Sequence, residues 1–134
     1  MPRKRPLASF MMWNHIAIAH AAYKCVRAGY KPLGYLGSLT TVLSLLYHRD
    51  HERYYVFPEG VCAKTCVLMV VYHGLRAKMS KVDAVLPSAI VFVLWRFSQR
   101  NYERWHPWMH IVVAADVHYF LFCIGRSRSD INRV

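Results

Sequence analysis

Apolar residues along this chain are grouped in five runs, and short polar or basic segments separate the runs. Each run is close to the length of about 17 to 25 residues that a helix needs to cross a bilayer. The second run lacks the charged face that a surface helix of a soluble protein carries. The pattern predicts an all-α fold, a polytopic membrane bundle of about five helices, with a compact soluble helical bundle as the alternative. The runs are residues 7–26, 33–48, 59–75, 83–98 and 106–124.

The two ends of the chain lie outside this helical domain of residues 7–124. Residues 1–6 form a basic leader, and residues 125–134 form a polar tail. A basic start before an apolar run also fits a signal sequence, but no small-residue cleavage site is obvious and the next residues are again basic. We therefore expect a first helix that is retained, either crossing the membrane or lying at its surface.

Turn and capping residues predict where some of the helices end. Gly29 and Pro32 are expected to end the first helix and begin the second. Asp83 is expected to be the N-cap of the fourth helix, because its carboxylate can accept a hydrogen bond from a free backbone N–H group.

The chain is both hydrophobic and strongly basic. Hydrophobic residues make up 55% of it, and 18 Lys and Arg against 7 Asp and Glu give a net charge of +11. Most of the basic residues lie between the runs, where a membrane protein meets the lipid head groups. We expect membrane lipids, or acidic partner subunits, as the counterparts of this charge. Nucleic acid is not an expected partner, because no nucleic-acid-binding motif is present.

Two charged side chains lie at similar depth well inside the runs, away from the ends of the runs. Asp116 is in the fifth run and Lys64 is in the third. A charged group inside a membrane is costly unless it is paired. The sequence therefore predicts an ion pair between Lys64 and Asp116, in preference to a proton-relay role for Asp116.

Two pairs of polar residues are the candidates for chemistry. Ser44 and His48 are four residues apart, as are His106 and His110, so each pair lies on one face of a helix. If runs two to five alternate in direction, both pairs and Glu59 fall near the same membrane face. Polar groups in membrane spans are usually kept for function. The simpler alternatives are that the histidines are interfacial hydrogen-bonding groups and that the Ser44 hydroxyl bonds to its own helix backbone.

These residues resemble the motifs of one superfamily, which joins alkaline ceramidases, progestin and adiponectin receptors, haemolysin III proteins and myomaker-like proteins. Ser44-Leu-Leu-Tyr-His48 resembles the motif of their second transmembrane helix, and His106-Pro-Trp-Met-His110 resembles the motif of their last helix. The family has seven helices, and its acidic residue is Asp where this chain has Glu59. The resemblance implies a zinc ion held by His48, His106 and His110, with Ser44 and Glu59 as catalytic residues around a metal-bound water.

The resemblance implies hydrolysis of a lipid amide of the ceramide type. Glu59 would take a proton from the water and return it to the leaving amine, and Ser44 would donate a hydrogen bond to the oxyanion. Such an enzyme is expected in endomembranes. The alternative is a non-catalytic accessory subunit of a large membrane complex, as in an organelle inner membrane, with the motif kept as a structural zinc clip or without metal.

Overall fold

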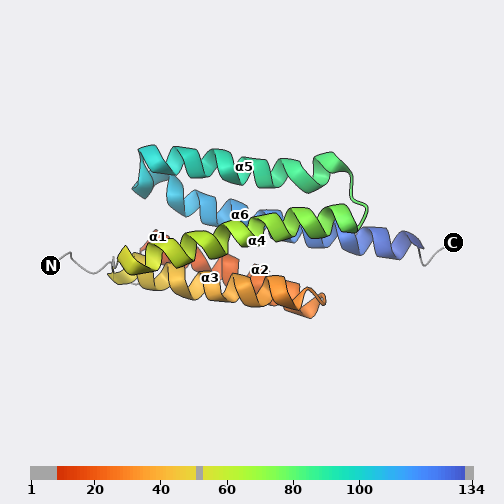
Figure 1. Cartoon of the computed structure of the whole chain (residues 1–134), viewed down its shortest axis with the longest axis horizontal. Helices are drawn as coiled ribbons and strands as arrows, with labels where there is room; N and C mark the ends of the chain where they lie inside the picture. Colours follow the sequence, from red (N-terminus) through yellow and green to blue (C-terminus); the bar gives the residue numbers. More distant parts are fainter. Residues whose placement is uncertain (1–8, 51–52, 132–134) are drawn as a thin grey trace.

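The computed structural model describes residues 9–50 and 53–131, and all of the regular structure in these residues is helical. This confirms the predicted all-α bundle. Two short elements accompany five longer helices (Figure 1). The elements are α1 (Phe10–Trp13), α2 (His15–Arg27), α3 (Lys31–Asp50), the 3₁₀ turn η1 (Arg53–Tyr55), α4 (Val56–Arg76), α5 (Lys81–Arg100) and α6 (Tyr102–Ile131).

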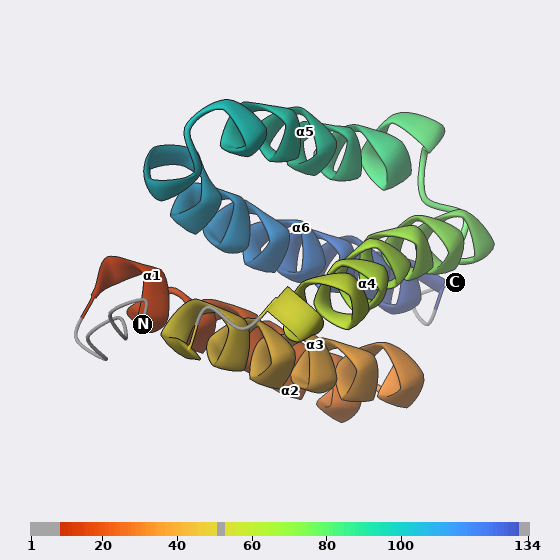
Figure 2. The ribbon, with the colours of Figure 1, turned by 60° about the vertical axis from the view of Figure 1, so that its left-hand side comes forward.

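The helices are arranged so that α6 runs through the bundle and contacts both of its sides. α2 packs on α3 and on α6, and α5 packs on α6 from the opposite side. α4 lies between α3 and α5 (Figure 2). The C-terminal part of α6 extends beyond the other helices (Figure 1). Because α3 and α6 run in opposite directions, the C-terminal end of α3 lies beside the N-terminal end of α6.

The end of α2 follows the expectation from its turn residues. Gly29 has a φ of 91°, and the N–H of Tyr30 donates to the carbonyl of Cys25 at 2.9 Å. This is a Schellman motif, in which glycine adopts the left-handed conformation at low cost. The end of α4 repeats the motif with Lys78, which has a φ of 60°. A side chain at this position is strained.

The start of α5 corrects the prediction for Asp83. The helix begins at Lys81, and its N-cap is Ser80, whose hydroxyl accepts a hydrogen bond from the backbone N–H of Asp83 at 3.0 Å. The prediction that Asp83 is the N-cap is therefore wrong. Asp83 is the third residue of the helix, where its carboxylate accepts a hydrogen bond from the Ser80 hydroxyl. Serine with an acidic residue three positions later is a known N-terminal signature.

The interface of α2 and α3 is unusually close because Gly34 lies on it. A Cβ atom at Gly34 would be 2.7 Å from the carbonyl oxygen of Ala22 and 2.9 Å from the backbone nitrogen of Val26. These are backbone atoms and cannot rotate away. The absence of a side chain at Gly34 thus allows α3 to approach α2, and this approach fixes where Ser44 and His48 lie relative to α2.

Three helices, α4, α5 and α6, are long and apolar enough to cross a membrane. Many of their large apolar side chains are exposed, as expected for surfaces that face lipid. Within the described residues, α2 and α3 do not meet the same conditions of length and mean hydropathy. α2 has only 13 residues, because Asn14 separates it from α1, and the expected first run of residues 7–26 is thus not one helix.

The predicted ion pair between Lys64 and Asp116 is not formed, so that prediction is wrong. Asp116 is buried and accepts a hydrogen bond of 2.8 Å from the Ser88 hydroxyl, which joins α6 to α5. The Lys64 ammonium lies instead over the ring of Trp95, 5.2 Å from its centroid. A hydroxyl, rather than an opposite charge, thus satisfies the buried carboxylate.

Candidate metal centre

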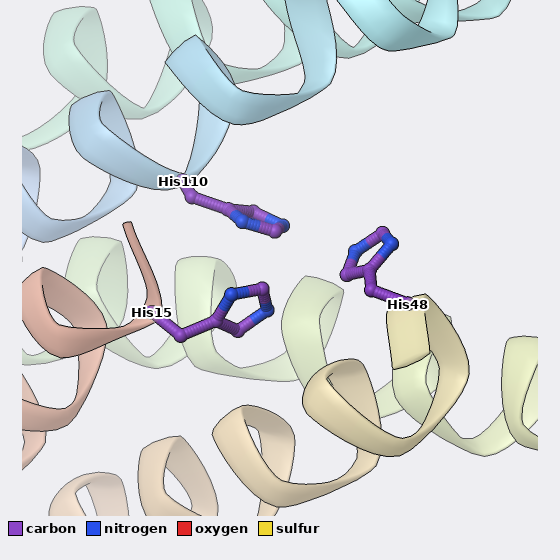
Figure 3. Close-up of side chains that lie close together, drawn as sticks. All are labelled: His15, His48 and His110. Carbon is purple, nitrogen blue, oxygen red and sulfur yellow. The ribbon is translucent and has the colours of Figure 1, made fainter. Parts of the chain in front are cut away.

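Three buried histidines from three helices meet at one end of the bundle. His15 begins α2, His48 lies near the end of α3, and His110 lies in the first half of α6. One ring nitrogen of each lies within 4.8 Å of the others, and the rings point toward one another (Figure 3). This spacing is suitable for a single ion, and the three histidines could hold one.

His106 adds a fourth imidazole to this cluster. Its ring centroid lies 4.9 Å from that of His48 and 4.6 Å from that of His110. The ring of Tyr102 stacks on His106 at 4.1 Å, and its hydroxyl lies 3.3 Å from Nδ1 of His48. All three histidines expected from the sequence therefore meet here, and Tyr102 packs against two of them.

The two expected catalytic residues lie at the same place. The hydroxyl of Ser44 is joined to Nε2 of His15 by a hydrogen bond of 2.9 Å, so it is not engaged with the backbone of its own helix as the alternative supposed. The Glu59 carboxylate lies next to the Ser44 hydroxyl. Ser44, Glu59, His106 and His110 all line one cavity.

Asn14 fixes the protonation and orientation of His110. Its side-chain nitrogen donates to the carbonyl of Pro107 at 3.1 Å, which leaves its side-chain oxygen to face Nδ1 of His110 at 2.9 Å. An amide oxygen only accepts, so Nδ1 of His110 must carry the proton. The lone pair of His110 is then on Nε2. A hydrogen bond of this kind orients metal-binding histidines in general.

Three members of the cluster, namely Asn14, His15 and Tyr102, were not predicted from the sequence. A signal for two of them was present, since Asn14 and His15 are adjacent polar residues inside the first apolar run. No spacing rule connects them to Ser44 or His110, which lie 29 and 96 residues away from His15 and Asn14, respectively. Only the packing of α2 against α3 and α6 brings them together.

The cavity continues from the histidines into the apolar interior and has a volume of about 130 Å³. Along α3 it extends from Ser44 back to Leu33, a rise of about 16 Å. Apart from the polar end, its lining is almost entirely apolar. Most of the lining residues are buried, whereas Lys64 on α4 and Phe92 on α5 are exposed. The cavity therefore opens sideways, between α4 and α5.

The donor set fits a transition metal. Neutral imidazole nitrogens bind zinc, copper, iron and nickel, whereas calcium and magnesium prefer oxygen ligands. The protonated Nδ1 of His110 shows that this ring can be neutral and present a lone pair. Burial removes the ring nitrogens of the histidines from water, which costs free energy, and binding a metal ion would offset that cost.

Comparison with known proteins adds no assignment. No family model, curated protein or solved structure matches this chain. The function therefore rests on the chemistry of the cluster and its cavity.

Proposed function

We propose that this protein is a membrane-embedded, zinc-dependent hydrolase of a lipid amide. The observation that carries the proposal is the convergence of imidazole, hydroxyl and carboxylate groups at the buried end of an apolar cavity. Ser44, Glu59, His106 and His110 all line that cavity, and His48 packs against His106. Such a cavity suits the polar group to be cleaved and the adjoining part of an apolar chain, the rest of which can extend out through the lateral opening.

The proposed zinc ligands are His48, His106 and His110. Zinc in a site with an open position supplies Lewis acidity and lowers the pKa of a bound water to about 7. Asn14 orients His110, and Tyr102 contacts both His48 and His106. The substrate's carbonyl would lie beside Ser44, whose hydroxyl can donate a hydrogen bond to the oxygen as negative charge develops.

Glu59 is the proposed proton carrier. Its carboxylate lies beside Ser44 at the polar end of the cavity. In the reaction a water oxygen bonds to the amide carbon, the C–N bond breaks, and Glu59 moves one proton from the water to the leaving nitrogen. The products are a carboxylic acid and an amine, so atoms and charge balance without any further reactant.

The proposed location is an endomembrane, which the protein would cross several times, and the length and apolar character of α4, α5 and α6 support it. The lateral opening of the cavity lies between α4 and α5, two helices long and apolar enough to cross a bilayer. A substrate dissolved in the membrane would enter from the lipid without passing through water.

One observation favours the rival, a non-catalytic metal clip in an accessory subunit of a larger complex. His15, rather than His106, completes the group of three histidines whose ring nitrogens lie within 4.8 Å of one another, and its ring centroid is 4.5 Å from that of His110. Together with His48, His106 and His110 it would make four protein ligands. Four protein ligands leave no open position, which is the pattern of a structural zinc site. Whether His15 binds the metal or only holds Ser44 distinguishes the two functions.

The hydrolase is tested with the protein purified in detergent and a set of long-chain amides. We expect release of fatty acid that a chelator abolishes and zinc restores. The Glu59→Gln variant should lose about 10²-fold or more in kcat while keeping its metal, because only the proton carrier is removed. His118→Ala is the matched control, since His118 lies two turns away from His110 and contacts His20 instead. Equal activity of Glu59→Gln and the unmutated protein would overturn the assignment.

Substitution by cobalt separates the enzyme from the clip. The visible absorption spectrum of bound cobalt(II) depends on the number and kind of its ligands. If His48, His106, His110 and a water bind the metal, the His15→Ala variant should have the same spectrum as the unmutated protein. If His15 and His106 both bind the metal beside His48 and His110, the spectrum should change in His15→Ala and in His106→Ala, and the structural clip is supported instead.

A further inference from the structure

Lys64 is a cation in the middle of an apolar helix, and the site described above gives it no role. It is the ninth residue of α4, which is 21 residues long and apolar enough to cross a membrane. A lysine at such a depth is costly and is generally kept for function. In the described part of the chain it forms no ion pair, and its ammonium lies over the ring of Trp95.

Lys64 lies at the entrance of the cavity that leads to the histidines. Among the lining residues, Lys64 and Phe92 are the exposed ones, whereas residues deeper in the cavity, such as Leu33 and Val117, are buried. Trp95 is half-buried and also lines the cavity. The entrance is therefore formed by a cation and two aromatic rings, set in an otherwise apolar surface.

Lys64 is also close to the proposed reaction site. It is five residues after Glu59 on the same helix, a rise of about 7.5 Å. Its ammonium acts electrostatically on the Glu59 carboxylate. A group attached to the leaving nitrogen of a substrate, pointing toward the entrance, would therefore come within reach of the flexible Lys64 side chain.

We propose that the substrate's amine part carries a carboxylate, so that the protein acts on N-acyl amino acids. The amide part of this inference rests on the proposed function. The Lys64 ammonium would bind the carboxylate at the entrance, and the acyl chain would lie in the apolar part of the cavity. One lysine presents a single positive charge, which balances the single negative charge of a carboxylate but leaves half of the charge of a phosphate uncompensated in apolar surroundings.

A neutral amide would use this entrance poorly. An amide of the ceramide type has hydroxyl groups but no negative charge to set against the Lys64 ammonium, which lies among apolar residues at the entrance. An electrostatic attraction in such surroundings is stronger than in water. The carboxylate would therefore strengthen substrate binding. It would also fix the orientation of the substrate, because the charged end stays at Lys64 and the acyl chain enters the cavity.

The test uses binding probes that cannot be hydrolysed. In these probes an ether replaces the amide, so binding is measured separately from catalysis. Dodecyloxyacetate carries the carboxylate, 2-dodecyloxyethanol is its neutral match, and 2-dodecyloxyethyl phosphate is the phosphate match. Affinity for the purified, metal-loaded protein is measured by equilibrium titration of tryptophan fluorescence, at one fixed detergent concentration.

We expect the carboxylate probe to bind about tenfold more tightly than the neutral probe. Lys64→Met should remove this preference and leave the affinity for the neutral probe unchanged, whereas Lys64→Arg should keep it. Lys81→Met is the control, since Lys81 lies outside the cavity lining at the start of α5. Equal affinity for the carboxylate and neutral probes, an unchanged preference in Lys64→Met, or a preference for the phosphate probe would each overturn the proposal.

Failure of the anion site at Lys64 and failure of the proposed hydrolase would give different results. A carboxylate preference that depends on Lys64, found in a protein that hydrolyses no amide, would keep the anion site and reject the hydrolase. Hydrolysis of neutral and anionic amides at equal kcat/KM, unaffected by Lys64→Met, would keep the hydrolase and reject the anion site.

Discussion

The two sides of the bundle place their polar and apolar groups in opposite ways. Where α2, α3 and α6 meet, polar side chains are buried, including Asn14, His15, Ser44 and His48. On α4 and α5, apolar side chains are exposed instead. The five most exposed of them are Phe57, Leu68, Val82, Leu86 and Val93.

The difference shows how a small helical bundle can build a site. Exposed apolar residues on α4 and α5 suit a lipid environment but cannot provide chemistry. Buried polar residues cost free energy unless they bond to one another, and here they do so across three helices. The histidines and Ser44 thus lie on the side where the helices approach most closely, and the start of α4 adds Glu59 to them.

The largest effect is expected from breaking the close approach of α2 and α3. Gly34→Ala places a methyl group against the backbone of α2, and we expect it to lower the free energy of unfolding by about 3 kcal/mol. Metal binding should weaken as well, because α3 carries Ser44 and His48. Thermal unfolding followed by circular dichroism measures the first effect.

Gly125→Ala is the control for this variant, because a Cβ atom at Gly125 would meet no atom within 4 Å. Alanine favours helix, so this variant should be as stable as the unmutated protein or more stable. Equal melting temperatures of Gly34→Ala and Gly125→Ala would show that the α2–α3 approach is looser than described.

A smaller effect should follow from removing Asn14. Asn14→Ala leaves His110 without the acceptor that fixes its tautomer, so metal affinity should fall about 10- to 100-fold. Competition with a zinc-binding dye measures it. Asn101→Ala is the matched control, since Asn101 is exposed and its side chain accepts only from the backbone of Arg104. Unchanged affinity in Asn14→Ala would remove Asn14 from the site.

Ser88→Ala tests the other side of the bundle. It removes the hydroxyl that donates to Asp116, and the buried carboxylate is left without that bond. We expect a loss of about 1 to 3 kcal/mol in stability, with metal affinity unchanged. Ser38→Ala should cost less, because the Ser38 side chain is exposed and bonds only to the carbonyl of Gly34. A loss of metal in Ser88→Ala would contradict the separation of the two sides.

The smallest effect is expected at the turn between α4 and α5. Lys78→Gly relieves a left-handed conformation at a non-glycine residue and should raise stability by up to about 1 kcal/mol. Neither metal content nor activity should change, because Lys78 follows the C-terminal end of α4, whereas Glu59 lies near the start of that helix. A lower melting temperature would mean that the Lys78 side chain stabilises the turn.

The fold was largely predictable because apolar runs and helix ends follow from local residues. The last four runs correspond to α3, α4, α5 and α6. One error was local, since Ser80 rather than Asp83 is the N-cap of α5, and another was non-local, since Asp116 bonds to Ser88 rather than to Lys64. At the candidate site, helix periodicity was enough to pair Ser44 with His48. It could not reveal Asn14 and His15, because their partners lie on other helices.

The most direct test of the central claim is the metal content of the purified protein. It should be compared with a His106→Ala, His110→Ala double variant and a His73→Ala, His118→Ala control. We expect about one zinc ion per chain in the unmutated protein and the control, and none in the double variant. Absence of metal from the unmutated protein, or equal metal in the double variant, would contradict the proposed site and the hydrolase built on it.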